Sequence, residues 1–125
     1  MTTETRKWVE KAEGDYAAAL PLRKSRKKHT REIVCFHLQQ CLEKYLKARL
    51  VEADHEFPKT HDLEKLLDLV VKLEPMWEVL RPSLAEITDY VPASVAGAAA
   101  FEFSDAVSAW FIRPWLRLTF HFDIF

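Results

Sequence analysis

The hydrophobic and polar positions of this chain follow a helical period most clearly between Cys35 and Ala48. At about 100° per residue, one compact polar stripe runs along this segment, and apolar side chains occupy the rest of the circumference. A helix that is apolar over so much of its surface lies at the centre of a bundle. Its polar side chains must therefore either pair with other groups of the protein or take part in binding. The stripe consists of His37, Gln40, Glu43, Lys44 and Lys47.

Helical spacing also defines the first half of the chain around this central helix. A first helix is expected from about Thr3 to Leu20, where Pro21 ends or kinks it because proline lacks a backbone donor. The central helix should run from Thr30, as its N-cap, to about Ala53. The stripe expected to be buried on the first helix comprises Trp8, Val9, Ala12, Tyr16, Ala19 and Leu20.

Shorter helices are predicted after a connection at residues 54–59. Asp62 opens a third helix, whose apolar positions continue to Leu73 with helical spacing. Pro75 fits the first turn of a fourth helix. Residues 81–82 (Arg-Pro) should interrupt that helix, and residues 83–86 (Ser-Leu-Ala-Glu) form a capping-box pattern that restarts it.

The carboxyl-terminal third has a less uniform pattern. Residues 91–100 are small and apolar, and the conformation of residues 91–103 is ambiguous from the sequence. Ser104 can cap a fifth helix, whereas residues 118–125 alternate with period two, as strands do. We therefore predict a single domain over residues 1–125. Its fold class is all-α, an antiparallel bundle of four or five helices with a strand-like tail.

Length and composition fit a single globular domain of 125 residues, with 49% apolar and 30% charged residues. No apolar run approaches the roughly 20 residues that span a bilayer, and the first ten residues do not resemble a signal peptide. We expect a cytoplasmic protein without membrane contact. Cys35 and Cys41 are then expected to be buried thiols in a reducing compartment.

The net charge of −1 conceals an asymmetry along the chain. Residues 1–31 carry nine Lys or Arg against four acidic residues, whereas the remainder carries nine basic and fifteen acidic residues. The basic density peaks at residues 23–29. This segment can attract nucleic acid, but it has no interleaved aromatic residues for stacking single strands. A solvated loop is therefore favoured over nucleic-acid binding.

The polar stripe also carries a family resemblance, together with two other segments. Residues 36–40 (Phe-His-Leu-Gln-Gln), Glu43-Lys44 and Lys47-Ala48 are followed by residues 57–63 (Phe-Pro-Lys-Thr-His-Asp-Leu) in the order and spacing of the HEPN domain family. Residues 8–15 resemble the usual opening of that family at Trp8, Ala12 and Asp15. The resemblance covers about residues 5–73. It implies a helical HEPN fold.

The resemblance implies a non-catalytic, dimeric module of toxin–antitoxin-like or regulatory type, which binds a nucleotide or a nucleotidyltransferase partner. No catalytic residue and no cofactor is assigned. The nucleotide-binding candidates are His37, Gln40, Lys44, Lys47, Lys59 and His61. Amide and ammonium groups in this set can contact a base and a phosphate. Structural alternatives stay open: Glu43 and Lys47 can form an i,i+4 ion pair, and His61 can cap the third helix.

Two other functions are weighed against binding. Ribonucleases of the family resemble one another in an Arg followed after four to six residues by His, late in the domain. Here Arg117 and Arg113 stand at the wrong distance from His121, and Arg31 and His37 lie outside the expected region and point about 120° apart on a helix. A metal-independent endoribonuclease is thus an alternative only, as is a purely structural interaction module. The histidine and cysteine spacing does not indicate a metal site.

Overall fold

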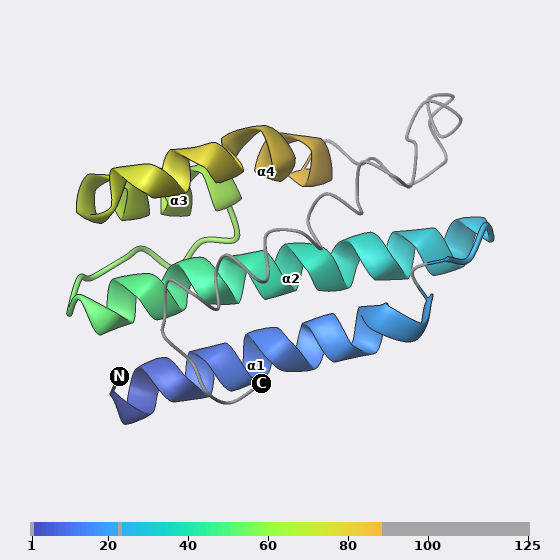
Figure 1. Cartoon of the computed structure of the whole chain (residues 1–125), viewed down its shortest axis with the longest axis horizontal. Helices are drawn as coiled ribbons and strands as arrows, with labels where there is room; N and C mark the ends of the chain where they lie inside the picture. The colour runs from blue at the N-terminus through green and yellow to red at the C-terminus, as the bar shows by residue number, and fades with distance from the viewer. Residues whose placement is uncertain (1, 23, 89–125) are drawn as a thin grey trace.

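The computed structural model of this chain describes residues 2–22 and 24–88 (Figure 1). Within these ranges the chain is helical and contains no strand, which confirms the all-α prediction. The expectations for residues 91–103, for a fifth helix after Ser104 and for the strand-like tail lie outside the described residues. The elements are α1 (Thr3–Ala19), η1 (Leu20–Leu22), α2 (Lys28–Glu52), α3 (Leu63–Leu73), η2 (Pro75–Leu80) and α4 (Arg81–Thr88), of which η1 and η2 are 3-10 helices.

Helix α1 begins and ends close to the predicted positions. The Thr2 hydroxyl caps its start by accepting a hydrogen bond from the Thr5 amide at 3.1 Å. At the other end the α-helix tightens into η1, where Pro21 stands. The predicted buried stripe is only partly correct, because Leu20 is 38% exposed and Trp8 and Tyr16 are half-buried at the edge of the core. The fully buried positions of α1 are Thr5, Val9, Ala12 and Ala19.

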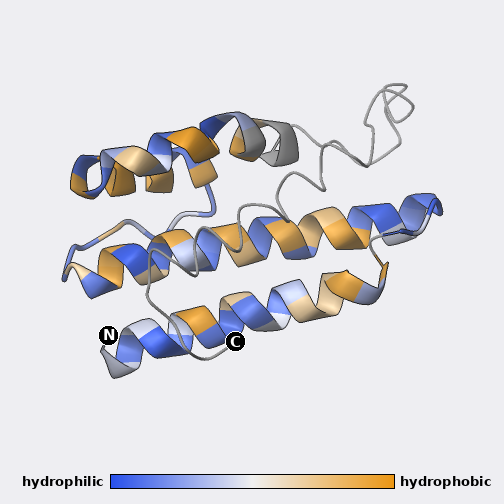
Figure 2. Cartoon of the chain, in the orientation of Figure 1, coloured by the Kyte–Doolittle hydropathy of each residue, from blue (hydrophilic) through white to orange (hydrophobic). Residues whose placement is uncertain are grey.

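Helix α2 is the central element, as its sequence predicts. It lies between α1 and the α3–α4 layer (Figure 1), and its apolar residues are distributed along its length (Figure 2). The prediction that Thr30 caps it is wrong: the helix begins at Lys28 after the extended Lys27, which makes no side-chain cap hydrogen bond. The packing of a helix 25 residues long outweighs one missing cap. Its first residues are polar, and they form the end of the α1–α2 hairpin with the basic loop (Figure 2).

Helix α3 runs in the same direction as α2. His61, just before α3, contacts Glu43 in the middle of α2, and Glu74, just after α3, contacts Arg49 nearer the carboxyl end of α2. The connection between the two helices therefore leads back along α2 before α3 starts. The antiparallel arrangement holds for α1 with α2, and for α3 with the η2–α4 segment, where Arg81 donates a hydrogen bond to Asp68 at 2.7 Å.

The η2–α4 segment corrects two local expectations. Residues 75–80 form a 3-10 helix rather than an α-helix, and α4 follows directly at Arg81. Pro82 is accommodated because proline is tolerated in the first turn of an α-helix, where its missing donor has no intrahelical role. The expected interruption and the capping box at Ser83 are therefore wrong, since Ser83 lies within α4. Trp77 and Leu80 enter the core from η2.

Candidate functional site

The polar stripe of α2 faces α1 at Asp15. The Asp15 carboxylate accepts a hydrogen bond at its Oδ2 from the Lys44 ammonium, and its Oδ1 lies 3.0 Å from Nδ1 of His37. All three side chains are largely covered, so this contact is less screened by water than a surface ion pair. One carboxylate on α1 thus holds two of the predicted nucleotide-binding residues.

The second part of the stripe is organised by Glu43. Its Oε1 lies 3.5 Å from the Lys47 ammonium, which confirms the expected i,i+4 ion pair, and 2.5 Å from Nδ1 of His61. Glu43 and Lys47 are only 4% and 8% exposed, so the pair is buried rather than a solvated surface feature. Breaking such a pair from one side is costly because the remaining charge stays in a poorly hydrated place.

Two aromatic rings complete the surroundings of Lys47. Its ammonium lies 5.6 Å from the ring centroid of Trp8 and 5.8 Å from that of Phe57. The two rings meet edge to face, at 6.3 Å between centroids and 75° between planes. Cation–π attraction adds to the Glu43 ion pair in fixing this lysine. Lys47 therefore joins α1, α2 and the connection that precedes α3.

The expectation that His61 caps α3 is wrong. The side chain of Asp62 performs that role, since its Oδ1 accepts hydrogen bonds from the amides of Glu64 and Lys65 at 3.0 and 3.2 Å. The imidazole of His61 turns instead toward Glu43, and 86% of its side chain stays exposed. A carboxylate buried on α2 offers the ring a charged partner, which is stronger than a neutral amide.

The remaining candidates lie on the surface near this histidine. Gln40 is half-buried and borders a small hollow of about 160 Å³ between α2 and the start of α3, with Gln39, Glu43, His61 and Leu63 as the other lining residues. Lys59 is exposed in the connection between the helices. The structure thus separates the six candidates into His37 and Lys44 at Asp15, Lys47 and His61 at Glu43, Gln40 beside the second group, and Lys59 on the loop.

Three residues of this arrangement were not among the sequence candidates. Asp15 holds the first group, and Trp8 and Phe57 flank Lys47. Asp15 and Trp8 are positions at which the chain resembles the HEPN opening. The resemblance could therefore have indicated both residues. The buried stripe predicted for α1 places Asp15 beside Ala12 and Ala19, but the sequence does not show which residues of α2 its carboxylate contacts.

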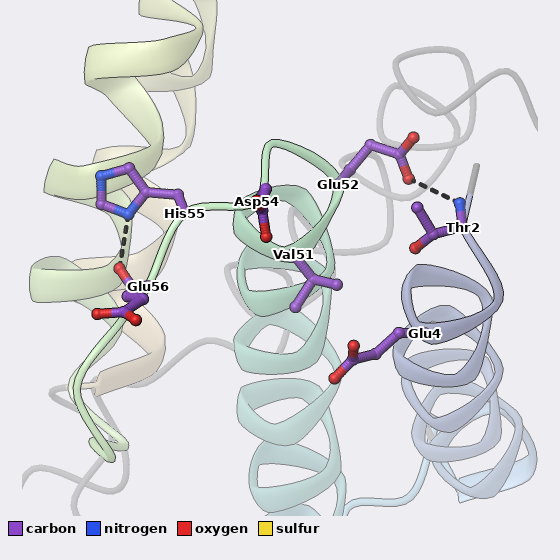
Figure 3. A pocket seen from close by; sticks show the side chains of 7 residues that line it. All are labelled: Thr2, Glu4, Val51, Glu52, Asp54, His55 and Glu56. Atoms are coloured by element: carbon purple, nitrogen blue, oxygen red, sulfur yellow. Dashed lines mark hydrogen bonds between the residues drawn. The ribbon is translucent and has the colours of Figure 1, made fainter.

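Two larger hollows border the same hairpin. One, of about 380 Å³, lies where the start of α1 meets the end of α2 (Figure 3). It is lined by four acidic residues together with Thr2, Val51 and His55, and such a lining repels phosphate. The other, also of about 380 Å³, lies along α1 and is lined by Thr3, Glu4, Lys7, Trp8 and Lys11.

The two cysteines of α2 are both buried thiols that form no disulfide, as expected. Burial raises the pKa of the Cys35 thiol to about 12, although the positive charge of Arg31 acts in the opposite direction. A thiol with so high a pKa stays protonated and is a poor nucleophile and metal ligand. Among residues 2–22 and 24–88, no group of three His, Cys, Asp or Glu side chains is placed to hold a metal ion.

Comparison with known proteins gives one match. The sequence model of the HEPN domain matches residues 5–109. Neither the curated proteins nor the solved structures contain a match to this chain. In the part that the structure describes, no helix has both the length and the apolar character to cross a membrane.

Proposed function

This chain belongs to the HEPN domain family, and from that premise we propose that it acts by binding rather than by catalysis. In this proposal it is a homodimeric module of toxin–antitoxin-like or regulatory type. It recognises a nucleotide or a nucleotidyltransferase partner. The family and the helical fold are established by the sequence match and the structure; the binding role and the dimer are the proposal.

The pairing of the α2 stripe is the observation that supports binding most. Lys44 and His37 share the Asp15 carboxylate, and Lys47 is buried against Glu43. General acid–base catalysis needs a group that can exchange its proton with a substrate. Side chains that pair with one another in this way are better suited to fixing the relative positions of the helices than to exchanging protons. The arrangement of helices that these pairs fix leaves Gln40, Lys59 and His61 at the surface, where they can contact a ligand.

Thermal denaturation with added nucleotide tests this function. We expect at least one of AMP, ATP, GTP and UTP, at up to millimolar concentration, to raise the melting temperature, because a ligand that binds only the folded state stabilises it. At a concentration one hundred times the Kd the gain is about 2.7 kcal/mol. If none of the four shifts the transition, nucleotide binding is rejected, and a purely structural interaction module becomes the better account.

An endoribonuclease is a second candidate because of the contact between Asp15 and His37. A carboxylate at Nδ1 orients an imidazole and prepares its other nitrogen, Nε2, to accept a proton. Lys44 neutralises the same carboxylate, however, and Arg31, the nearest arginine of the predicted type, is six positions away on α2. The sequence pairs that involve His121 lie outside the described residues.

Incubation with mixed RNA separates the two candidates. The binding account predicts no cleavage by the purified protein, with or without a chelator. Cleavage that resists the chelator and disappears in the His37→Gln variant would establish a metal-independent ribonuclease instead. The Lys72→Gln variant is the matched control, since Lys72 is exposed on α3 and is not among the residues proposed to contact a ligand.

A further inference from the structure

The first turns of α1 carry a second candidate for ligand binding, lined by residues other than those of the α2 stripe. A hollow of about 380 Å³ on its first three turns is lined by five residues that recur with helical spacing along one side of the helix: Thr3, Glu4, Lys7, Trp8 and Lys11. Sites for small molecules usually occupy about 300–1,000 Å³. The hollow beside Gln40 and His61, at about 160 Å³, is below that range.

Trp8 gives this hollow a rigid aromatic surface. Its ring packs edge to face on Phe57 and lies 5.6 Å from the ammonium of the buried Lys47, which Glu43 holds in turn. These contacts fix the indole from the interior of the molecule. The ring is nevertheless only half-buried, so part of it faces the hollow. A fixed, partly exposed indole is a platform on which a flat ring can stack.

Exposed lysines surround this platform. The Lys11 ammonium lies 5.6 Å from the Trp8 ring centroid, and Lys7 lines the same hollow one turn earlier on α1. Unlike Lys47, both are exposed, so their ammonium groups can move to meet an anion. Among the lining residues that the structure describes, Glu4 is the single acidic one. Its carboxylate opposes a phosphate but can accept a hydrogen bond from a sugar hydroxyl or a base amino group.

We propose that Trp8, Lys7 and Lys11 form a site for a base that carries a phosphate, with the base stacked on Trp8 and the phosphate between the two lysines. This inference rests on the proposed nucleotide-binding function and names a place for it. In this arrangement the base replaces the Lys11 ammonium at the ring, and Lys11 turns to the phosphate. The acidic hollow of Figure 3 has a comparable volume but the wrong charge for this ligand.

Such a ligand can come from two sources, a free nucleotide or a single-stranded nucleic acid. Both present the same stacked base and phosphate. Calorimetric titration with ATP, AMP, adenosine and a single-stranded RNA hexanucleotide distinguishes them. A free nucleotide as the natural ligand predicts that ATP binds more tightly than the hexanucleotide, and a strand predicts the reverse. Adenosine should bind most weakly, because it offers the lysines no phosphate.

The Lys7→Gln/Lys11→Gln double variant tests the site with the fold intact, since both lysines are exposed. We expect the Kd for ATP to rise at least tenfold. The matched control is Lys65→Gln/Lys72→Gln on α3, which removes the same charge from exposed positions outside the three hollows and should change the Kd less than twofold. Equal Kd values for the Lys7/Lys11 variant and the unaltered protein would overturn the site while leaving the binding function standing.

Substitution of the tryptophan gives an independent readout. Trp8→Phe keeps an aromatic ring and should retain most of the affinity, whereas Trp8→Leu should lose it by tenfold or more; circular dichroism verifies that each variant folds. Nucleotide should quench the fluorescence of the unaltered protein, and the quenching should largely vanish in Trp8→Phe. Undiminished quenching in Trp8→Phe would contradict stacking at this position. Failure of the unaltered protein to bind any of the four probes would reject the proposed function as well as the site.

Discussion

At the scale of single residues, Asp15 holds one part of the polar stripe. It is one carboxylate for two partners, His37 and Lys44, and all three side chains are mostly shielded from water. Removing its charge leaves a largely covered ammonium without that anion. Such one-sided losses usually destabilise a protein more than the net value of the pair suggests.

The Asp15→Asn variant should therefore be less stable by about 2 kcal/mol, after allowance for the remaining exposure of both partners. Urea denaturation measures this change. The control Lys59→Met alters an exposed loop residue and should stay within about 0.5 kcal/mol of the parent. If Asp15→Asn is equally neutral, the stripe is not held by this carboxylate.

Cys35 provides a prediction about pH. Burial raises its native pKa to about 12, above the ordinary thiol value of 9.0. Because the unfolded thiol ionises first, its contribution to stability is complete below pH 9 and falls between pH 9 and 12. The slope approaches about 1.4 kcal/mol per pH unit. Cys35→Ala should show a shallower loss of stability over this range, and identical pH profiles of the two proteins would contradict the burial of the thiol.

At the scale of elements, α2 determines the core. Leu42 and Tyr45 are both buried on it, and the Tyr45 hydroxyl donates a hydrogen bond to Glu13 on α1. Leu42→Ala and Tyr45→Ala should each cost about 2–5 kcal/mol in the free energy of unfolding. Chemical denaturation checks this expectation. Losses below about 0.5 kcal/mol at both positions would mean that α2 is not the central helix.

A helix boundary can be predicted from the sequence when the residues that determine it are neighbours in the sequence. The apolar period of α2 and the start of α3 at Asp62 depend on neighbouring residues, and the sequence predicts both, although it favours His61 rather than Asp62 as the capping side chain. The start of α2 and the continuous η2–α4 segment depend on packing. Packing overrides the preference of Thr30 for an N-cap position and the tendency of Pro82 to interrupt a helix. The direction of α3 follows from the path of its preceding connection, which leaves no periodic signal in the sequence.

The contacts of the candidate site, like the helix boundaries, could be predicted only in part. Glu43 and Lys47 pair across one turn of the same helix, so their contact follows from spacing alone. The contacts of Asp15 and Trp8 with α2 join residues at least 22 positions apart. The contact of Glu43 with His61 spans 18 positions and that of Phe57 with Lys47 spans ten. Predicting such contacts requires knowledge of how α1 and α2 are rotated about their axes relative to each other. The amphipathic pattern defines that rotation only roughly.

At the scale of the whole molecule, surface apolar residues bear on the oligomeric state. Ile33 and Phe36 on α2, and Met76 and Val79 on η2, are each about half exposed or more. Exposed apolar groups often mark interfaces. We predict a homodimer at micromolar concentration, measured by light scattering. Phe36→Glu should shift the mass toward the monomer if α2 contributes, whereas a monomeric parent protein would contradict the predicted state directly.

We propose that this HEPN protein binds a nucleotide without transforming it. Isothermal titration of the full chain with ATP, followed by chromatography of the recovered ligand, tests both halves together. The account predicts saturable binding at one site per chain, with ATP recovered unchanged. An absence of binding up to millimolar ATP, GTP and UTP, or conversion of the bound nucleotide, would contradict it.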